Sequence, residues 1–455
     1  MRIEKDCVGK LEVPDDALYG IHSLRAARNF PITKEKVDPL LIESYVQIKK
    51  ASITANYGAK ATNVIKYNTV VDACDYLLEH PSPESFITPA IQGGAGTSTN
   101  MNVNEVIANV AMKLHPDVFI HPNDDVNQAQ STNDTYPTAG KLAMIKRLPK
   151  LTSEINRLIE ILDELSKKFQ FTIKLGRTQL QDAVPTTYGK TFHAYASLFR
   201  RDLKRINSAE NELKTVSMGG TAIGTGTNTT KYYRDHIVDE INKITGLDLK
   251  QDEDLIDAVQ NTDHFVAFSS SLKTLAVDLS KFSNDLRLLG SGPQSGLNEL
   301  ILPKRQAGSS IMPNKVNPVI PEVVNQVAFE VIGFDATVTA ASEAGQLELN
   351  AFEPIMFKSI LTAEVHLARA IETLVNHCLD GIDVNVKQCL DDVRKSAVTA
   401  TVLSPILGYN KTTEIIKTAT KEHETVPNLL IQNHILSPEK VKQLFSPEYL
   451  VNGES

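Results

Sequence analysis

The residues best suited to chemistry lie in one short stretch, GSSIMPNKVNP, at residues 308–318. It presents the hydroxyls of Ser309 and Ser310, the amine of Lys315 and the amide of Asn317. Two prolines and a glycine interrupt regular structure, so the stretch is predicted to be a loop between two long helical patterns. Hydroxyl, amine and amide groups together suit an anionic ligand. We expect this loop to close onto a site formed by the rest of the chain.

Four further segments are polar and interrupt the helical patterns. QGGAGTST at 92–99 runs into a helical pattern, so this Gly-rich loop is expected to feed a helix N-terminus. HPNDDVNQAQSTNDTYP at 121–137 holds almost no apolar residues and is predicted to be a second polar loop. Irregular structure is also predicted at 174–185 (KLGRTQLQDAVP) and 217–230 (SMGGTAIGTGTNTT).

Simpler explanations compete with a functional one for each segment. Ser131–Asp134 could form a helix N-cap, although a cap explains one of the four residues. Thr178 could lie in a surface loop, and a single lysine such as Lys315 is usually a solvated cation. Lys315, however, lies in a predicted loop of roughly thirty residues, and loops of that length inside a compact helical protein are usually functional or disordered.

Other kinds of site are disfavoured. The glycines at 219–226 follow no strand and precede no Lys-Ser/Thr pair, so a dinucleotide or P-loop site is improbable, and N–H groups aimed at an anion fit better. His121 and the Asn and Asp residues after it are better explained as a solvated turn than as metal ligands. Few groups remain that could remove a proton. Serine could do so if N–H dipoles and Lys315 stabilise its alkoxide.

The composition limits the class of protein. At 455 residues the chain is long enough for two or three domains, and a net charge of -8 argues against a general grip on nucleic acid or acidic membranes. No apolar run approaches the roughly 18 residues of a membrane span, and the charged N-terminus lacks the apolar core of a signal peptide. Four scattered cysteines predict reduced thiols in a cytoplasmic protein rather than a disulfide or zinc framework.

Apolar residues spaced by three and four positions predict an all-α protein with few strands. The strongest patterns run from Leu151 to Phe169 and from Phe265 to Leu289, and looser ones cover about 188–214, 320–344 and 356–380. Five helices of this length predict a bundle. Shorter helical patterns lie at about 39–57 and 68–78, and turns with a small hairpin are expected before residue 40. Three domains are predicted: an N-terminal domain at 1–136, a central helix-bundle domain at 137–385 and a small C-terminal domain at 386–455. The generous apolar faces predict a homo-oligomer.

These motifs resemble the aspartase/fumarase superfamily, whose signature loop has the form found at 308–318. The resemblance covers nearly the whole chain and extends through four more segments: AGTSTNMNVNEVIAN at 95–109, HPNDDVNQAQSTND at 121–134, GRTQLQDAVP at 176–185 and GGTAIGTGTN at 219–228. Motifs of this length are very specific. The resemblance implies a three-domain, all-α fold whose five-helix bundles form a twenty-helix core in a homotetramer, with each active site built from three subunits.

Within the superfamily the chain is more similar to the aspartase branch than to the hydratases. YGIHSLR at 19–25 and QLELNAFEP at 346–354 resemble the aspartase forms. Gln179 stands where the hydratases carry a His that pairs with a Glu, here Glu322, so that pair is not assembled. The resemblance therefore implies reversible anti-elimination of ammonia from L-aspartate to give fumarate, with no cofactor and no metal site in the sequence.

The resemblance also implies a role for each site residue. Ser309 is the general base, and its loop closes over the substrate and excludes water. The intermediate is an aci-carboxylate with two negative charges, stabilised by hydroxyl groups whose hydrogen bonds strengthen as the charge develops. The implied stabilising residues are Thr97, Ser131, Thr132 and Ser310. The implied substrate contacts are Lys315, Asn317 and Thr178 to the α-carboxylate, Asn133 to the amino group, and Gln179.

Two departures from the family pattern and two alternative functions stay open. Asn314 replaces the usual Gly, and since Asn tolerates positive φ the loop keeps its shape with less freedom. The C-terminal region is shorter than usual. The alternatives are fumarate hydratase on the same scaffold and a catalytically idle structural member, which the intact Ser309, Lys315 and Asn317 argue against.

Overall fold

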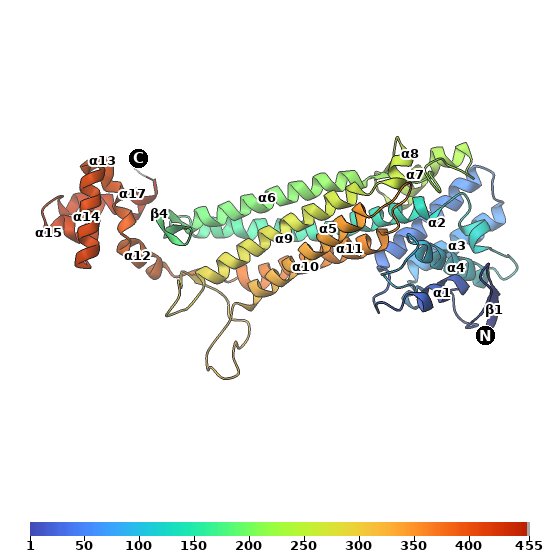
Figure 1. Ribbon diagram of the computed structural model, residues 1–455, viewed down its shortest axis with the longest axis horizontal. Helices are drawn as coiled ribbons and strands as arrows, with labels where there is room; N and C mark the ends of the chain where they lie inside the picture. Colours follow the sequence, from blue (N-terminus) through green and yellow to red (C-terminus); the bar gives the residue numbers. More distant parts are fainter. Residues whose placement is uncertain (453–455) are drawn as a thin grey trace. The chain divides into compact units, whose positions relative to one another are not determined.

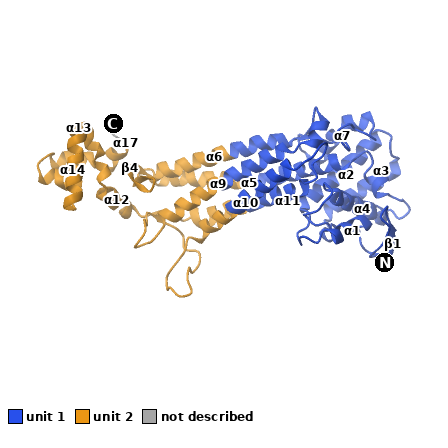
Figure 2. Cartoon of the chain, viewed as in Figure 1, with its two compact units in different colours: residues 1–152, 203–276, 328–368 blue, residues 153–202, 277–327, 369–455 orange. Residues whose placement is uncertain are grey.

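The computed structural model describes residues 1–452 as a mainly helical chain (Figure 1). It divides into two compact units: residues 1–152, 203–276 and 328–368 form unit 1, and residues 153–202, 277–327 and 369–455 form unit 2 (Figure 2). No helix among the described residues has both the length and the hydropathy needed to cross a membrane.

Five long helices confirm the predicted bundle, and each contributes a segment to both units. They are α5 (Thr132–Lys168), α6 (Tyr188–Leu213), α9 (Asp263–Leu289), α10 (Val319–Glu343) and α11 (Glu353–Leu374). Their apolar faces pack as the three-four spacing predicts. In unit 1 the Phe357 ring contacts Tyr136 and Phe265, with centroids 4.9 Å apart in both pairs. In unit 2 Phe282 contacts Tyr195 and Phe199.

The predicted polar loop at 121–137 ends earlier than expected, because α5 begins at Thr132. Ser131 Oγ accepts the N–H of Asn133 at 3.2 Å, and the Asp134 carboxylate accepts the N–H of Ser131 at 3.0 Å. These bonds satisfy N–H groups at the helix start that would otherwise have no partner. The cap that competed with a functional explanation of 131–134 therefore exists. A π-helical turn, Pro122–Val126, also lies within this segment.

The rest of unit 1 surrounds the start of the bundle with shorter elements. They are β1 (Arg2–Lys5), β2 (Lys10–Val13), α1 (Ile21–Asn29), α2 (Pro39–Gly58), α3 (Val64–Glu79), α4 (Thr97–Leu114), β5 (Thr215–Val216), α7 (Lys231–Thr245), β6 (Lys250–Gln251) and α8 (Leu255–Gln260). The hairpin β1–β2 and helices α2, α3 and α4 confirm predictions. The sequence did not predict helix α1, because the group that caps its start lies far along the chain. The buried Glu105 accepts the N–H groups of Gly20, His22 and Ser23 there.

In unit 2 the prediction of irregular structure at 174–185 is wrong. Strands β3 (Ile173–Thr178) and β4 (Gln181–Thr187) pair antiparallel through a two-residue turn, in which Gln179 and Leu180 have φ of 54° and 63°. Hairpin turns of this kind usually carry Asn-Gly or Asp-Gly, so Gln-Leu at these positions does not signal a turn. Short strands β7 (Leu300–Ile301) and β8 (Asp383–Val384) also pair.

The predicted small helices after residue 385 are present in unit 2. They are α12 (Val386–Lys395), α13 (Ser404–Leu407), α14 (Tyr409–Glu422), α15 (Val426–Gln432), α16 (Pro438–Leu444) and α17 (Pro447–Asn452), with a 3-10 segment at Ala397–Leu403. Most of them share an apolar cluster that includes Leu403, Leu430 and Leu444.

Candidate active site

In unit 1 the predicted hydroxyl residues lie at the starts of two helices. Thr97 is the first residue of α4 and Thr132 the first of α5. Asn100, in the first turn of α4, donates from Nδ2 to Thr132 Oγ1 at 3.0 Å and so joins the two helix starts. Unpaired N–H groups and the helix dipole make such ends favourable for negative charge. The local geometry therefore agrees with an anion-binding role.

Gly96 allows α4 to start where it does. Its φ is 84°, a left-handed conformation that glycine adopts without strain, and a Cβ atom there would overlap the ring of Tyr136. The sequence signal for this helix start, a Gly-rich loop before an apolar periodicity, was therefore physically correct.

The loop at 217–228 joins the same cluster through α5. Asp134 Oδ2 accepts the N–H groups of Gly219 at 3.2 Å and Thr221 at 3.0 Å, and Asn133 Nδ2 donates to the Ala222 carbonyl at 2.8 Å. Backbone N–H groups of the loop thus bind an anion that belongs to the chain itself. Burial raises the pKa of Asp134 to about 6, against the effect of the backbone N–H donors of Ser131, Gly219 and Thr221 and of the charge of Lys49.

In unit 2 the signature loop at 308–318 carries Ser309, partly exposed. Ser309 Oγ accepts the N–H groups of Met312 at 2.9 Å and Ile311 at 3.2 Å. Hydrogen bonds donated to a hydroxyl oxygen favour its anionic form. Two backbone N–H dipoles therefore point at the oxygen of Ser309. The loop extends from the helices between α9 and α10 (Figure 1).

The shape of this loop is held at its base. The N–H of Gly308 donates to the Lys315 carbonyl at 2.8 Å, and Asn317 Nδ2 donates to the Gly308 carbonyl at 3.1 Å. Asn314 has a φ of 65°, which confirms that asparagine tolerates the positive φ expected at this position. Lys315 and Ser310 are exposed, and Asn317 is half-buried.

Thr178 and Gln179 are exposed at the tip of the β3–β4 hairpin, also in unit 2. The fully buried Glu299 ties this hairpin to the fold: it pairs with Arg177 of β3 and accepts the Tyr188 hydroxyl at 2.8 Å. Arg177 is therefore engaged within the fold, whereas the two predicted site residues beside it are presented to solvent.

The predicted residues thus form two groups, each described in its own unit. Unit 1 brings together Thr97, Ser131, Thr132 and Asn133. Unit 2 carries Thr178, Gln179, Ser309, Ser310, Lys315 and Asn317. Within residues 1–452 no group of three or more His, Cys, Asp or Glu side chains is arranged to bind a metal ion.

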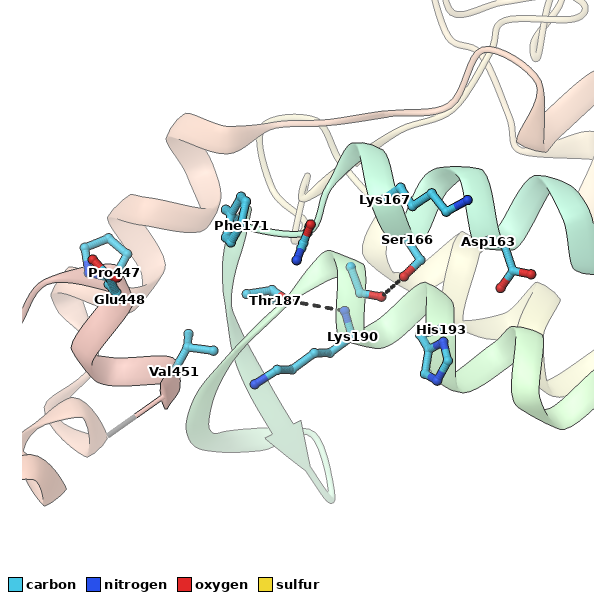
Figure 3. Close-up of a pocket in the computed structure, with 12 residues that line it drawn as sticks. Asp163, Ser166, Lys167, Phe171, Thr187, Lys190, His193, Pro447, Glu448 and Val451 are labelled. Atoms are coloured by element: carbon cyan, nitrogen blue, oxygen red, sulfur yellow. Dashed lines mark hydrogen bonds between the residues drawn. The ribbon is translucent and has the colours of Figure 1, made fainter. Parts of the chain in front are cut away.

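A cavity of about 930 Å³ in unit 2 is lined by none of these residues (Figure 3). It lies between the end of α5, the start of α6 and α17, and is lined by charges of both signs, including Lys167, Lys190, Asp163 and Glu448. Of the hydrogen bonds drawn there, the one from Ser166 Oγ to the Gly189 carbonyl joins α5 to the start of α6. The other, from the Lys190 N–H to Thr187 Oγ1, lies at the start of α6.

Sequence reasoning missed the buried polar residues behind the unit 1 group. Lys49 is fully buried beside Asn100, and Glu353, fully buried as well, has its pKa raised by burial to about 8. Lys49 is followed by a second lysine, Lys50, in the same helical pattern, and the sequence analysis did not single it out. A lysine at an otherwise apolar position of a helix face was the available signal.

Comparison with known proteins adds evidence over the whole chain. A family model described as lyase matches residues 9–333, and one described as fumarase C C-terminus matches residues 400–452. The chain is 46% identical to the aspartate ammonia-lyase of Helicobacter pylori over 99% of this chain and 98% of that protein. It is 45% identical to the aspartate ammonia-lyase of Pseudomonas aeruginosa, over 99% and 97% of the two chains.

Solved structures agree with these similarities. The fumarate lyase:delta crystallin of Brucella melitensis bound to cobalt superposes with a TM-score of 0.95 at 44% identity, covering 98% of each chain. The class II fumarase of Schistosoma mansoni superposes with a TM-score of 0.95 at 30% identity, covering 100% of each chain.

Proposed function

The chain belongs to the lyase family of the aspartase/fumarase superfamily, and on that premise we propose that it catalyses the reversible deamination of L-aspartate to fumarate and ammonia. It is a carbon–nitrogen lyase, and the full-length similarity to aspartate ammonia-lyases supports aspartate as the substrate. Gln179, at the exposed tip of the β3–β4 hairpin, supports the same choice, because the superfamily's hydratases carry a His there.

One geometric observation carries the proposed mechanism: Ser309 Oγ accepts two backbone N–H groups. Ser309 is the general base that removes a proton from Cβ of aspartate, and the N–H donors help its oxygen carry negative charge. The resulting aci-carboxylate holds two negative charges. Thr97, Ser131, Thr132 and Ser310 donate hydrogen bonds to it, and these bonds strengthen as the charge develops.

The other proposed contacts orient the substrate. Lys315, Asn317 and Thr178 hold the α-carboxylate. Asn133 contacts the α-amino group: its Nδ2 donates to the Ala222 carbonyl, so its Oδ1 is turned the other way and can accept a hydrogen bond from the substrate ammonium. Gln179 is the remaining residue proposed to contact the substrate. Closure of the 308–318 loop brings Ser309 to Cβ and excludes water.

The proposed assembly is a cytoplasmic homotetramer in which each active site takes residues from three subunits, with no nucleic-acid or membrane partner. The division into an N-terminal part (1–136), a bundle (137–385) and a C-terminal part (386–455) remains part of this proposal. Shared sites are consistent with the two separate groups of site residues in the chain, and exposed apolar side chains on the bundle helices, such as Phe329 of α10, are available for subunit contacts.

The reverse reaction distinguishes this function from hydration of the same alkene. Purified protein is mixed with fumarate, with and without ammonium, and the fumarate absorbance is followed. The proposal expects absorbance to fall only when ammonium is present. A fall without ammonium would identify a hydratase and contradict the proposal.

A further inference from the structure

Lys49 of α2 is a buried cation whose three N–H groups are all used. Its side chain is 0% exposed, and Nζ donates to three amide oxygens: Asn100 Oδ1 at 2.7 Å, Asn127 Oδ1 at 2.8 Å and Gln130 Oε1 at 2.8 Å. An ammonium has three donors and no acceptor, so this shell satisfies it completely. All of these residues lie in unit 1.

This shell fixes which way the Asn100 amide points. Because Oδ1 faces Lys49, the NH₂ group faces the other way and donates to Asn127 Oδ1 at 3.1 Å and to Thr132 Oγ1 at 3.0 Å. Thr132 Oγ1 is therefore an acceptor in this bond. Its own hydrogen must point elsewhere and is available to donate to a ligand.

We propose that Lys49 is a positioning residue for the deamination: through Asn100 it holds the Thr132 hydroxyl in the orientation that donates to the charge developing on the substrate. The assignment rests on the proposed function, since it concerns the same site. Lys49 does not touch the substrate. A buried ion rarely stabilises a fold more than a well-packed apolar side chain would, so folding alone gives little reason for a lysine here.

The charge of Lys49 is essential to the arrangement. A neutral amine has two N–H groups for three oxygens, so its loss of a proton would leave one amide oxygen facing a lone pair and allow Asn100 to turn. Burial lowers the pKa of Lys49 to about 7, opposed by the charge of Asp134 on α5. The other titratable groups packed around it stay neutral near that pH, because burial raises the pKa values of Tyr45 (α2), Cys74 (α3) and Tyr233 (α7).

A double-mutant cycle in the full-length protein tests the link between Lys49 and Thr132. Lys49→Met, Thr132→Val and the double variant are assayed for kcat and KM with L-aspartate. Lys49→Met is expected to lower kcat about ten- to a hundredfold with little change in KM, since only an interaction with developing charge is lost. The double variant should be no slower than Thr132→Val alone. Losses that multiply would show that Lys49 does not act through Thr132 and would overturn the proposal.

Two more variants keep the test decisive if Lys49→Met does not fold. Asn100→Asp retains an acceptor for Lys49 but removes the donor to Thr132, so kcat should fall to a similar extent while circular dichroism is unchanged. A wild-type kcat in Asn100→Asp would overturn the proposal. The matched control is Lys50→Met, the next lysine of α2, which pairs with Asp75 at 2.5 Å and should leave kcat unchanged.

The pH profile gives a readout that a purely structural role would not move. In the wild type kcat should decline on the alkaline side as Lys49 loses its proton, and this decline should be absent from the residual activity of Lys49→Met. An unchanged alkaline decline in the variant would contradict the proposal. Wild-type protein that forms no fumarate from L-aspartate would instead overturn the proposed function, and with it this role.

Discussion

At the scale of single residues, the chemistry depends on how each polar group is partnered. The resemblance of its loop to the superfamily signature implies Ser309 as the base, and in the structure two backbone N–H groups donate to its oxygen. The partners of Lys49 could not be predicted, because they lie 51, 78 and 81 residues away along the chain. A sequence pattern shows which polar groups a segment carries. It does not show which of these groups form hydrogen bonds with residues far along the chain.

Ser309→Ala should fold and bind the unreactive dicarboxylate succinate as the wild type does, yet lose turnover by about 10⁴-fold, the upper range for loss of a general base. Ser310→Ala, which removes only a stabilising hydroxyl, should lose about 10²-fold. Steady-state kinetics with L-aspartate and calorimetric titration with succinate measure both effects. If Ser309→Ala kept most of its activity, Ser309 could not be the base.

At the scale of secondary structure, the site in unit 1 depends on helix starts that are tied to loops. The apolar spacing predicted α6, α9 and α10 within about two residues, because that spacing reports directly which face is buried. It missed the first part of α5, which begins at Thr132 and not at the predicted Leu151. It failed where a distant group decides the structure. Glu105 caps α1 from another helix, and the turn of the β3–β4 hairpin uses Gln179 and Leu180 in a conformation that their residue types do not signal.

Asp134, which joins α5 to the 217–228 loop, should make stability depend on pH. Its pKa is raised from 3.8 to about 6 when folded. The folded chain therefore keeps a proton between these values that the unfolded chain has released, so this contribution is full below about pH 4 and is lost as pH rises through 6. Between pH 4 and pH 7 it should lower the free energy of unfolding by about 3 kcal/mol.

Urea unfolding of Asp134→Asn and wild type across this pH range measures that contribution, since asparagine does not titrate. Between pH 4 and pH 7 the free energy of unfolding should decrease less in Asp134→Asn than in the wild type. Asp235→Asn is the control: the Lys231 partner lowers the pKa of exposed Asp235, so its effect should be small and of opposite sign. Identical pH dependence in Asp134→Asn and wild type would contradict the assigned role of Asp134.

At the scale of the whole molecule, the proposed site is assembled from several copies of the chain. Ser309 and Thr132 lie in different units, and the tetramer proposal places them in the same site from different subunits. The family, and with it the fold class, could be predicted from sequence because its motifs are long and specific. The contacts proposed between copies could not, since exposed apolar side chains mark a surface that is available for contact without showing which residues would cover it.

Mixing two variants of low activity tests this shared site. Ser309→Ala and Thr132→Val chains, unfolded together and refolded as mixed tetramers, should regain roughly a quarter of wild-type activity, because some sites then receive both intact residues from different chains. Each variant refolded alone is the control. Mixed tetramers with no more activity than these controls would indicate that one chain supplies both residues.

The central claim is that this chain removes ammonia from L-aspartate. Its most direct test is to incubate the purified protein separately with L-aspartate and with L-malate and to follow the fumarate absorbance. Fumarate should form from L-aspartate, with one ammonia released for each, and none should form from L-malate. Fumarate from L-malate alone would contradict the claim.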